Sequence, residues 1–221
     1  MLKVFVSGLL FSSTLLYSSY FSEAQKALQN NQINNAIELY KISAREGNDE
    51  ANFQLGKIYY LQKYKKRDLT KAYTYFKKAS DYEHTKAKYN LAVIYSLKTF
   101  KKHSYKQSYK LFYDLAKQDY PKAQYKVGIY LLYGLGIEKD YSMAKSWLER
   151  SYFVHGYDRA SCAIASIYAN GLGVIQNLGR ARNLSQSRIK KYPLCKKVFT
   201  EFKLYKNKYK KDKGFKYGYY N

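Results

Sequence analysis

Apolar and small residues recur along this chain at helical spacing, in pairs of segments separated by short polar turns. The alanines that open the first segment of each pair are 36, 36 and 37 residues apart. They are Ala51, Ala87, Ala123 and Ala160. A fixed period of this length is typical of helical repeats that stack on their neighbours. The pattern therefore predicts an all-α fold, a right-handed α/α solenoid of about five helix-turn-helix repeats of 36–37 residues plus a C-terminal capping helix.

Small residues mark two further positions in each repeat, where we expect the backbones of its helices to approach closely. In the first helices these residues are Gly56, Ala92, Gly128 and Ala165, and in the second helices they are Ala36, Ala72, Ser108, Ala144 and Ala181. Residues that cap helices precede the second set by four positions, and they are Asp68, Ser104, Asp140 and Asn177. Each is expected to accept a hydrogen bond from the first helical turn, which is worth about 1 kcal/mol.

Two Gly-x-Gly turns separate the helices of the fourth and fifth repeats, at Gly134 and Gly136 and at Gly171 and Gly173. Glycine permits the positive φ angles that such turns need. The same motif can cradle phosphate, but here it follows a helix, lacks a third glycine and is not followed by Gly-Lys-Ser/Thr. The sequence therefore favours a structural turn.

This order of residues resembles the Sel1-like repeat, a relative of the tetratricopeptide repeat. Val127-Gly128, Gly134, Gly136-Ile137, Asp140, Ala144 and Trp147 carry the resemblance best, and Ile164-Ala165, Tyr168, Gly171, Gly173-Val174, Asn177 and Ala181 carry it nearly as well. The second repeat has Gln62 and Tyr64 in place of the turn glycines, and the third departs further. The resemblance covers about residues 25–196. It implies a non-catalytic scaffold or adaptor that binds a protein or peptide on the concave face of its repeats.

The sequence divides into four segments. Residues 1–24 read as a signal peptide, because Lys3 precedes an apolar run and Ala24 fits a cleavage site; an uncleaved anchor is the alternative. The repeats occupy residues 25–196, a capping helix 197–209, and a basic aromatic tail 210–221. The sequence thus predicts export to the periplasm or outside the cell.

The charge is strongly positive, with 40 Lys and Arg against 16 Asp and Glu. Basic residues gather in two inter-helix turns and in the tail, as Lys63, Lys65, Lys66, Arg67, Lys101, Lys102, Lys210, Lys211 and Lys213. They form either a solvated rim or a contact surface for an anionic polymer or a membrane. The second possibility is an alternative function, and predicted export disfavours nucleic acid as the anion.

Cysteine and histidine offer little chemistry. Cys162 and Cys195 lie near the openings of consecutive first helices, and could be a disulfide or two free, mostly buried thiols. Some exported members of the resembled family have regular cysteine pairs with one bridge per repeat, a pattern that this chain does not share. His84, His103 and His155 fall in turns without partners at metal-ligand spacing. No cofactor or metal is therefore predicted.

One catalytic alternative remains. The cysteine-rich relatives are associated with weak penicillin binding and β-lactam hydrolysis, and Ser142 with Lys145, and Ser187 with Lys190, match the Ser-x-x-Lys motif. The supporting Ser-Asp-Asn and Lys-Thr-Gly motifs are absent from the sequence, so no catalytic residue is predicted. Function is expected on the surface instead, where any tyrosines that face the groove would supply rigid contact area with a polar tip.

Overall fold

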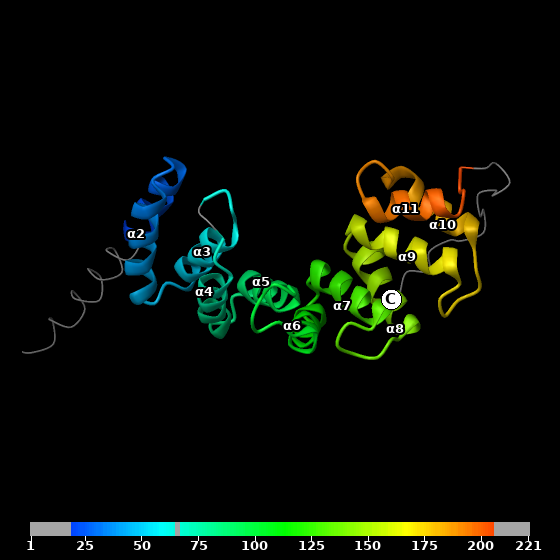
Figure 1. The fold of residues 1–221 in the computed structure, drawn as a ribbon, viewed down its shortest axis with the longest axis horizontal. Coiled ribbons are helices and arrows are strands. Elements are labelled where there is room, and N and C mark those ends of the chain that lie inside the picture. The colour runs from blue at the N-terminus through cyan, green and yellow to red at the C-terminus, as the bar shows by residue number, and fades with distance from the viewer. Residues whose placement is uncertain (1–18, 65–66, 206–221) are drawn as a thin grey trace, which may run out of the picture. The chain divides into compact units, whose positions relative to one another are not determined.

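The computed structural model describes residues 19–64 and 67–205, and all regular secondary structure in these ranges is helical (Figure 1). The predicted tail, most of the predicted signal peptide, Lys65 and Lys66 lie outside the described residues. The chain divides into two compact units, one ending at Ser104 and the other beginning at Tyr105. Among the described residues, no helix has both the length and the apolar character that a membrane span needs.

Within each unit, consecutive helices pack against each other as helical hairpins, as the all-α solenoid prediction requires. Unit 1 contains a helix at residues 19–29, α2 (Ile33–Arg45), α3 (Asp49–Tyr60), α4 (Leu69–Asp81) and α5 (Thr85–Ser96). Unit 2 contains α6 (Tyr105–Lys117), α7 (Pro121–Tyr133), α8 (Tyr141–Glu149) with a π-helical turn (Arg150–Val154), α9 (Asp158–Asn170), α10 (Leu178–Ser185) with a 3₁₀ turn (Gln186–Arg188), and α11 (Pro193–Glu201). The predicted all-α repeat fold is confirmed.

The capping helix differs from its predicted bounds of 197–209. It begins at Pro193, because proline at the first helical position has a pre-set φ and needs no hydrogen bond from its nitrogen. It ends at Glu201, and Lys203 then adopts a φ of 50° while the Leu204 N–H donates to the Phe199 carbonyl. Leu204 is fully buried, so the turn after the helix returns the chain to the core.

The helix at residues 19–29 contains the predicted cleavage site. Ala24 is fully buried, and the Phe21 ring packs edge-on against Tyr40 of α2, with ring centroids 5.5 Å apart. Cleavage after Ala24 would therefore remove the half of this helix that holds Phe21. Signal-peptide cleavage stays a prediction.

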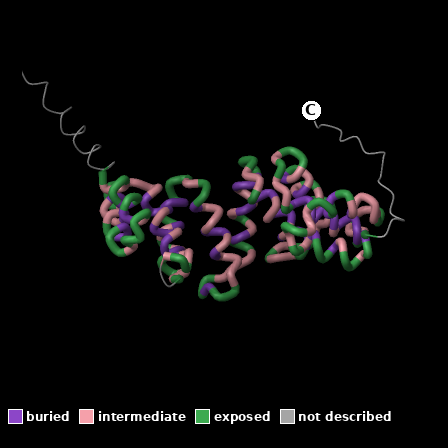
Figure 2. The backbone as a smooth tube through the Cα atoms, turned by 90° about the horizontal axis from the view of Figure 1, so that it is seen from above, coloured by how far each residue is buried: buried purple, intermediate pink, exposed green. Residues whose placement is uncertain are grey.

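The small positions lie where the two helices of a repeat cross. A Cβ atom at Gly56 would lie 2.5 Å from Phe76 of α4, and one at Gly128 would lie 2.5 Å from Leu148 of α8. Both distances are shorter than any normal contact, so only glycine fits at these two crossings. The alanines of the second helices are likewise fully buried, and the buried segments of Figure 2 follow the helices while the exposed ones follow the turns.

The predicted caps close the turns within the repeats. Side-chain oxygens of Asp68, Asp140 and Asn177 accept hydrogen bonds from backbone N–H groups three residues later, at 2.9, 2.8 and 2.8 Å. The backbone N–H of each of these cap residues donates a hydrogen bond to the carbonyl nine residues earlier. Ser104 forms the equivalent bond, to the Tyr95 carbonyl at 2.9 Å. The partners of the other three are Tyr59, Leu131 and Tyr168. One backbone pattern therefore closes all four turns, with or without glycine.

A second row of special positions lies in the turns between repeats. Gly47, Glu83, Asp119 and Gly156 all have positive φ, at 94°, 58°, 58° and 66°. These residues are 36, 36 and 37 apart, so the position is part of the repeat. A residue other than glycine is strained there by about 1–2 kcal/mol. Glu83 and Asp119 therefore adopt this positive φ at an energetic cost.

Stability should fall at alkaline pH because of Tyr40, whose side chain is buried against the first helix. Burial raises the Tyr40 pKa to about 12. The unfolded chain loses this proton near pH 10 and the folded chain near pH 12. The contribution of neutral Tyr40 to the free energy of unfolding is therefore fully present below pH 10 and is lost as the pH rises toward 12. Between pH 9 and pH 11 the free energy of unfolding should decrease by about 1.4 kcal/mol less in Tyr40→Phe than in the natural chain.

Urea titrations at these two pH values measure the effect. Tyr82→Phe is the matched control, because it makes the same change at a tyrosine that is 68% exposed. Tyr95, whose pKa is also raised to about 12, mainly by burial and then by its hydrogen bond to Tyr73, keeps part of the dependence in both variants. An unchanged slope in Tyr40→Phe would contradict the assignment.

Candidate functional site

The Gly-x-Gly turns serve packing. Gly134 and Gly171 end α7 and α9 with φ angles of 70° and 68°. A Cβ atom at Gly136 would lie 2.6 Å from the Lys106 backbone nitrogen of α6, and one at Gly173 would lie 2.9 Å from the Tyr141 Cβ of α8. Each turn thus packs on the second helix of the preceding repeat.

Cys162 and Cys195 form a disulfide in the structure, with the two Cα atoms 4.7 Å apart and both side chains buried. The bond joins α9 of the last repeat to α11, the capping helix. In the second and fourth repeats, the position equivalent to Cys162 holds an aromatic residue that contacts the N-cap residue of the first helix of the following repeat. These contacts are Phe53 on His84, with centroids 4.6 Å apart, and Tyr125 on Tyr157, at 5.5 Å. The disulfide therefore replaces an aromatic contact at the end of the array.

The basic turns of unit 1 place their cations over aromatic rings. Lys63 lies 4.3 Å from the centroid of Tyr64, Arg67 lies 4.7 Å from Tyr60, and Lys102 lies 5.0 Å from Tyr73. Within the described ranges no carboxylate forms an ion pair with these three side chains or with Lys101.

Both basic turns lie at one edge of unit 1. Phe100, in the second turn, packs on Tyr73 of α4 with centroids 5.3 Å apart. Helix α4 begins directly after the first turn, at Leu69. This edge therefore gathers positive charge that the described part of the chain leaves without ion pairs.

Histidine has structural roles here. The His84 Nδ1 atom accepts the Ala87 N–H at 3.2 Å, so His84 caps α5, and its Nε2–H then donates to Glu50 at 2.9 Å. His155 Nε2 lies 3.7 Å from Asp119. Across residues 19–64 and 67–205, no three metal-ligating side chains come together.

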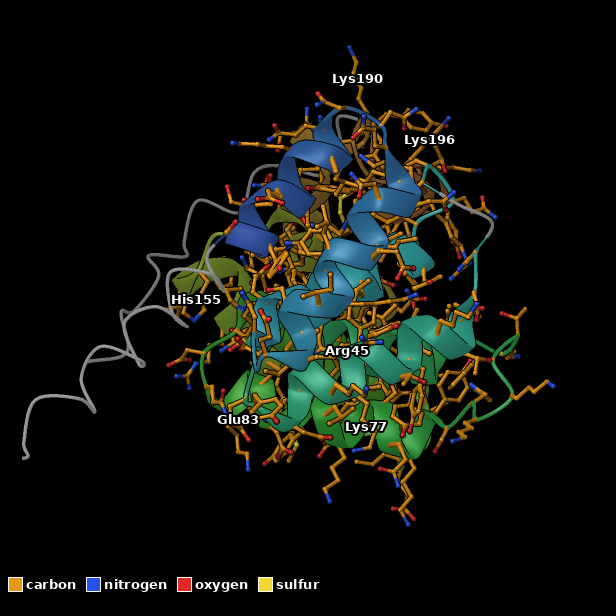
Figure 3. The ribbon with its side chains drawn as sticks, turned by 90° about the vertical axis from the view of Figure 1, so that its left-hand side faces the viewer. Arg45, Lys77, Glu83, His155, Lys190 and Lys196 are labelled. Carbon is orange, nitrogen blue, oxygen red and sulfur yellow. A yellow bond between two sulfur atoms is a disulfide. The ribbon has the colours of Figure 1, made fainter. Side chains whose placement is uncertain are left out.

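The Ser-x-x-Lys pairs do not assemble into a catalytic arrangement. The Lys145 ammonium group pairs with Glu149 at 2.9 Å, and Ser187 accepts a hydrogen bond from Arg188 at 3.0 Å. Lys190 extends away from the ribbon (Figure 3). Between the two serines and their lysines, the described part of the chain shows no hydrogen bond.

The tyrosines divide between core and surface. Tyr59 and Tyr168, at one repeat position, are buried, and Arg180 lies over the Tyr168 ring at 4.3 Å. The large apolar side chains that stay exposed were not marked by periodicity, because they lie at helix ends and in turns. They are Tyr82, Tyr133, Met143, Phe153, Val154, Ile175 and Tyr205.

The helical hairpins, the stacked glycine turns and the repeated caps define a repeat scaffold, and comparison with known proteins gives its family. The family model described as the Sel1 repeat matches residues 22–48, 49–81, 121–152 and 159–187, which is more than half of the chain. The chain belongs to the Sel1 repeat family. The unmatched third repeat is the one whose sequence departs most from the pattern, although its helices keep the repeat's spacing and the backbone hydrogen bond that closes its turn. No curated protein matches the sequence.

Solved structures share the fold. A Sel1 repeat protein from Oxalobacter formigenes is 25% identical, with a TM-score of 0.64 over 80% of this chain and 69% of that one. The protein c5321, a protective antigen of uropathogenic Escherichia coli with an SLR fold, is 21% identical, with a TM-score of 0.72 over 87% of this chain and 42% of that one. A putative Sel1 repeat protein from Klebsiella pneumoniae is 15% identical, with a TM-score of 0.52 over 85% and 93%.

Proposed function

We propose that this chain is an exported, non-catalytic scaffold that binds a partner protein in the cell envelope or outside the cell. Sel1 repeat proteins generally act in protein–protein interaction. One observation carries the proposal for this chain: the cysteines, His84 and Lys145 have structural contacts, while several large apolar side chains of the described residues remain exposed. Cysteines form a disulfide, His84 caps a helix and Lys145 pairs with Glu149, whereas Tyr133 is 50% and Ile175 92% exposed.

Two features of the chain support protein binding and export. Exposed aromatic side chains and methionine are enriched at protein interfaces, and unit 2 presents Tyr133 and Met143 on successive helices, α7 and α8. A disulfide persists in oxidising compartments, which supports export. Sel1 repeat scaffolds are typically non-enzymatic, which supports binding as the function of this surface.

Affinity capture tests the proposal. The full chain with a C-terminal tag is expressed in its source cells and captured from the envelope fraction, and the captured material is washed at low and then at high salt. We expect a discrete protein that survives high salt and is lost when Tyr133 and Ile175 are both changed to serine. Material that is retained only at low salt and contains no discrete protein would contradict the proposal.

Binding of an anionic polymer or membrane surface is the second candidate. The observation that favours it is the basic edge of unit 1, whose described cations Lys63, Arg67, Lys101 and Lys102 form no ion pairs. Changing these four to glutamine should then abolish capture, and binding should weaken steeply with salt. The protein-scaffold proposal instead expects the same variant to retain its partner.

A further inference from the structure

A cleft of about 590 Å³ opens in unit 1 between the C-terminal parts of α2 and α4, with the start of α3 as its floor. Its volume lies in the range of sites that bind small ligands or a few side chains. Lys41 and Arg45 line it from α2, Tyr75 and Lys78 from α4, and Asn52 from α3. Figure 3 shows Arg45 at the end of α2, on the side that faces the viewer.

Positive charge in the cleft exceeds negative charge. Lys41 pairs with Glu38 at 2.8 Å, and the acidic lining residue Asp81 pairs with Lys77, also at 2.8 Å. Arg45 and Lys78, by contrast, have no carboxylate at ion-pair distance within residues 19–64 and 67–205. Two cations are therefore left for an anion from outside, and one is a guanidinium group, which suits the planar carboxylate.

The floor holds an unpartnered amide. Asn52 is only 6% exposed, and its side chain forms no hydrogen bond in the described part of the chain. The Asn52 amide is not one of the fully buried polar atoms that lack a partner, so it opens to the cleft, and the absence of a hydrogen bond within the described part of the chain needs an explanation.

The other repeats supply that explanation. At the position of Asn52 they have Lys88, Gln124 and Ser161. Lys88 pairs with Glu83 at 2.7 Å, and Gln124 donates to Asp119 at 3.1 Å. In both cases the acid is the residue of positive φ five positions earlier.

Repeat two has glycine where that acid stands. Gly47 lines the cleft, and a Cβ atom there would have nothing within 4 Å. Ser161, which also follows a glycine, Gly156, instead donates to the Asp158 carbonyl of its own helix at 2.8 Å. Asn52 alone is left with neither partner.

We propose that this cleft binds an acidic side chain of a partner protein, whose carboxylate accepts hydrogen bonds from Asn52 and Arg45 in place of the acid that Gly47 lacks. The inference rests on the proposed function, because the partner is taken to be a protein, and it names the chemistry of one contact. Tyr75 and Tyr82 beside the cleft provide ring surface for the residues that flank the acid.

Fluorescence anisotropy on the full chain tests the site, with a labelled peptide Asp-Glu-Tyr-Asp-Glu-Tyr as probe and Asn-Gln-Tyr-Asn-Gln-Tyr as the neutral peptide. We expect Arg45→Gln to weaken binding of the acidic peptide at least tenfold. Lys190→Gln removes one charge from unit 2, outside the cleft, and should change the affinity less than twofold. Equal losses in the two variants would show that net charge binds the peptide, and would overturn the proposal.

Substitutions at Gly47 give a second, sharper comparison. Gly47→Asp restores the acid of the other repeats and should block the cleft from within, whereas Gly47→Asn has the same shape and the same strain at positive φ but no charge. We expect the aspartate variant to bind the acidic peptide at least tenfold more weakly than the asparagine variant. Equal affinities of these two variants would overturn the proposal.

The two proposals fail separately. If Arg45→Gln leaves peptide affinity unchanged while the tagged chain still captures a discrete protein, the cleft proposal is wrong and the scaffold proposal stands. If no discrete protein is captured from the envelope, the scaffold proposal is wrong whatever the peptide does.

Discussion

Changing Cys162 and Cys195 together to alanine should lower the free energy of unfolding of unit 2 by about 4 kcal/mol. The bond closes a loop with a sequence separation of 33 residues, and in the chain-entropy treatment its loss frees the unfolded chain by that amount. It also joins α9 to α11, so the capping helix would lose its covalent attachment to the last repeat. Replacing both residues avoids leaving one buried thiol free to react.

Fluorescence measures this effect in the right unit. Trp147, the only tryptophan, lies in α8 and packs edge-on against Tyr113, with centroids 5.9 Å apart, so its emission in urea follows unit 2. Dithiothreitol should bring the natural chain close to the alanine variant and leave that variant unchanged. A difference below about 1 kcal/mol between the oxidised chain and the variant would contradict the prediction.

Much of the fold could be predicted from the sequence, because the repeat depends on local rules. Spacing marks the small residues at helix crossings, and Gly128 and Gly56 are indeed at the closest contacts. Capping depends on residue type, so Asp68, Asp140 and Asn177 could be recognised without knowing their neighbours. The helices nevertheless begin two residues before the alanines chosen as openings, because the first turn of a helix has no apolar signature.

The positions that periodicity missed depend on backbone angles and on neighbours in space. Glu83 and Asp119 share a positive φ with Gly47 and Gly156, but a carboxylate gives no sign of such an angle in one sequence. Comparing the repeats in register at this position and five residues later would have shown the pairs Glu83 with Lys88 and Asp119 with Gln124. The same comparison would have drawn attention to Asn52.

The contacts of the candidate site residues could be predicted less well than the fold, because they depend on distances between helices and on side-chain placement. The spacing of the cysteines did not decide between a disulfide and two free thiols, because pairing depends on the distance between α9 and α11. The basic turns were visible as charge, but the stacking of Arg67 on Tyr60 and Lys102 on Tyr73 depends on side-chain placement. The α2–α4 cleft is lined by residues of three helices and by Gly47 between two of them, and their approach in space depends on how the helices pack.

Gly128→Val should lower the free energy of unfolding by about 3 kcal/mol, because the crossing of α7 and α8 has no room for a side chain. The Cβ atom alone would lie 2.5 Å from Leu148 Cγ and 3.1 Å from the Ala144 carbonyl oxygen. The leucine can rotate, but the carbonyl is backbone, so the helices must separate. Valine's better helix propensity than glycine offsets only a few tenths of a kcal/mol of that cost.

A double-mutant cycle separates crowding at this crossing from other effects of the valine. Leu148→Ala alone should cost about 2–5 kcal/mol through the cavity it leaves. Combined with Gly128→Val, it makes room for the new side chain, so the pair should cost at least about 1 kcal/mol less than the sum of the single changes. Gly156→Ala is the control for glycine loss without crowding, because a Cβ there meets nothing within 4 Å and only its φ of 66° is strained. Strictly additive costs for the pair would mean that Gly128 is required for a reason other than its contact with Leu148.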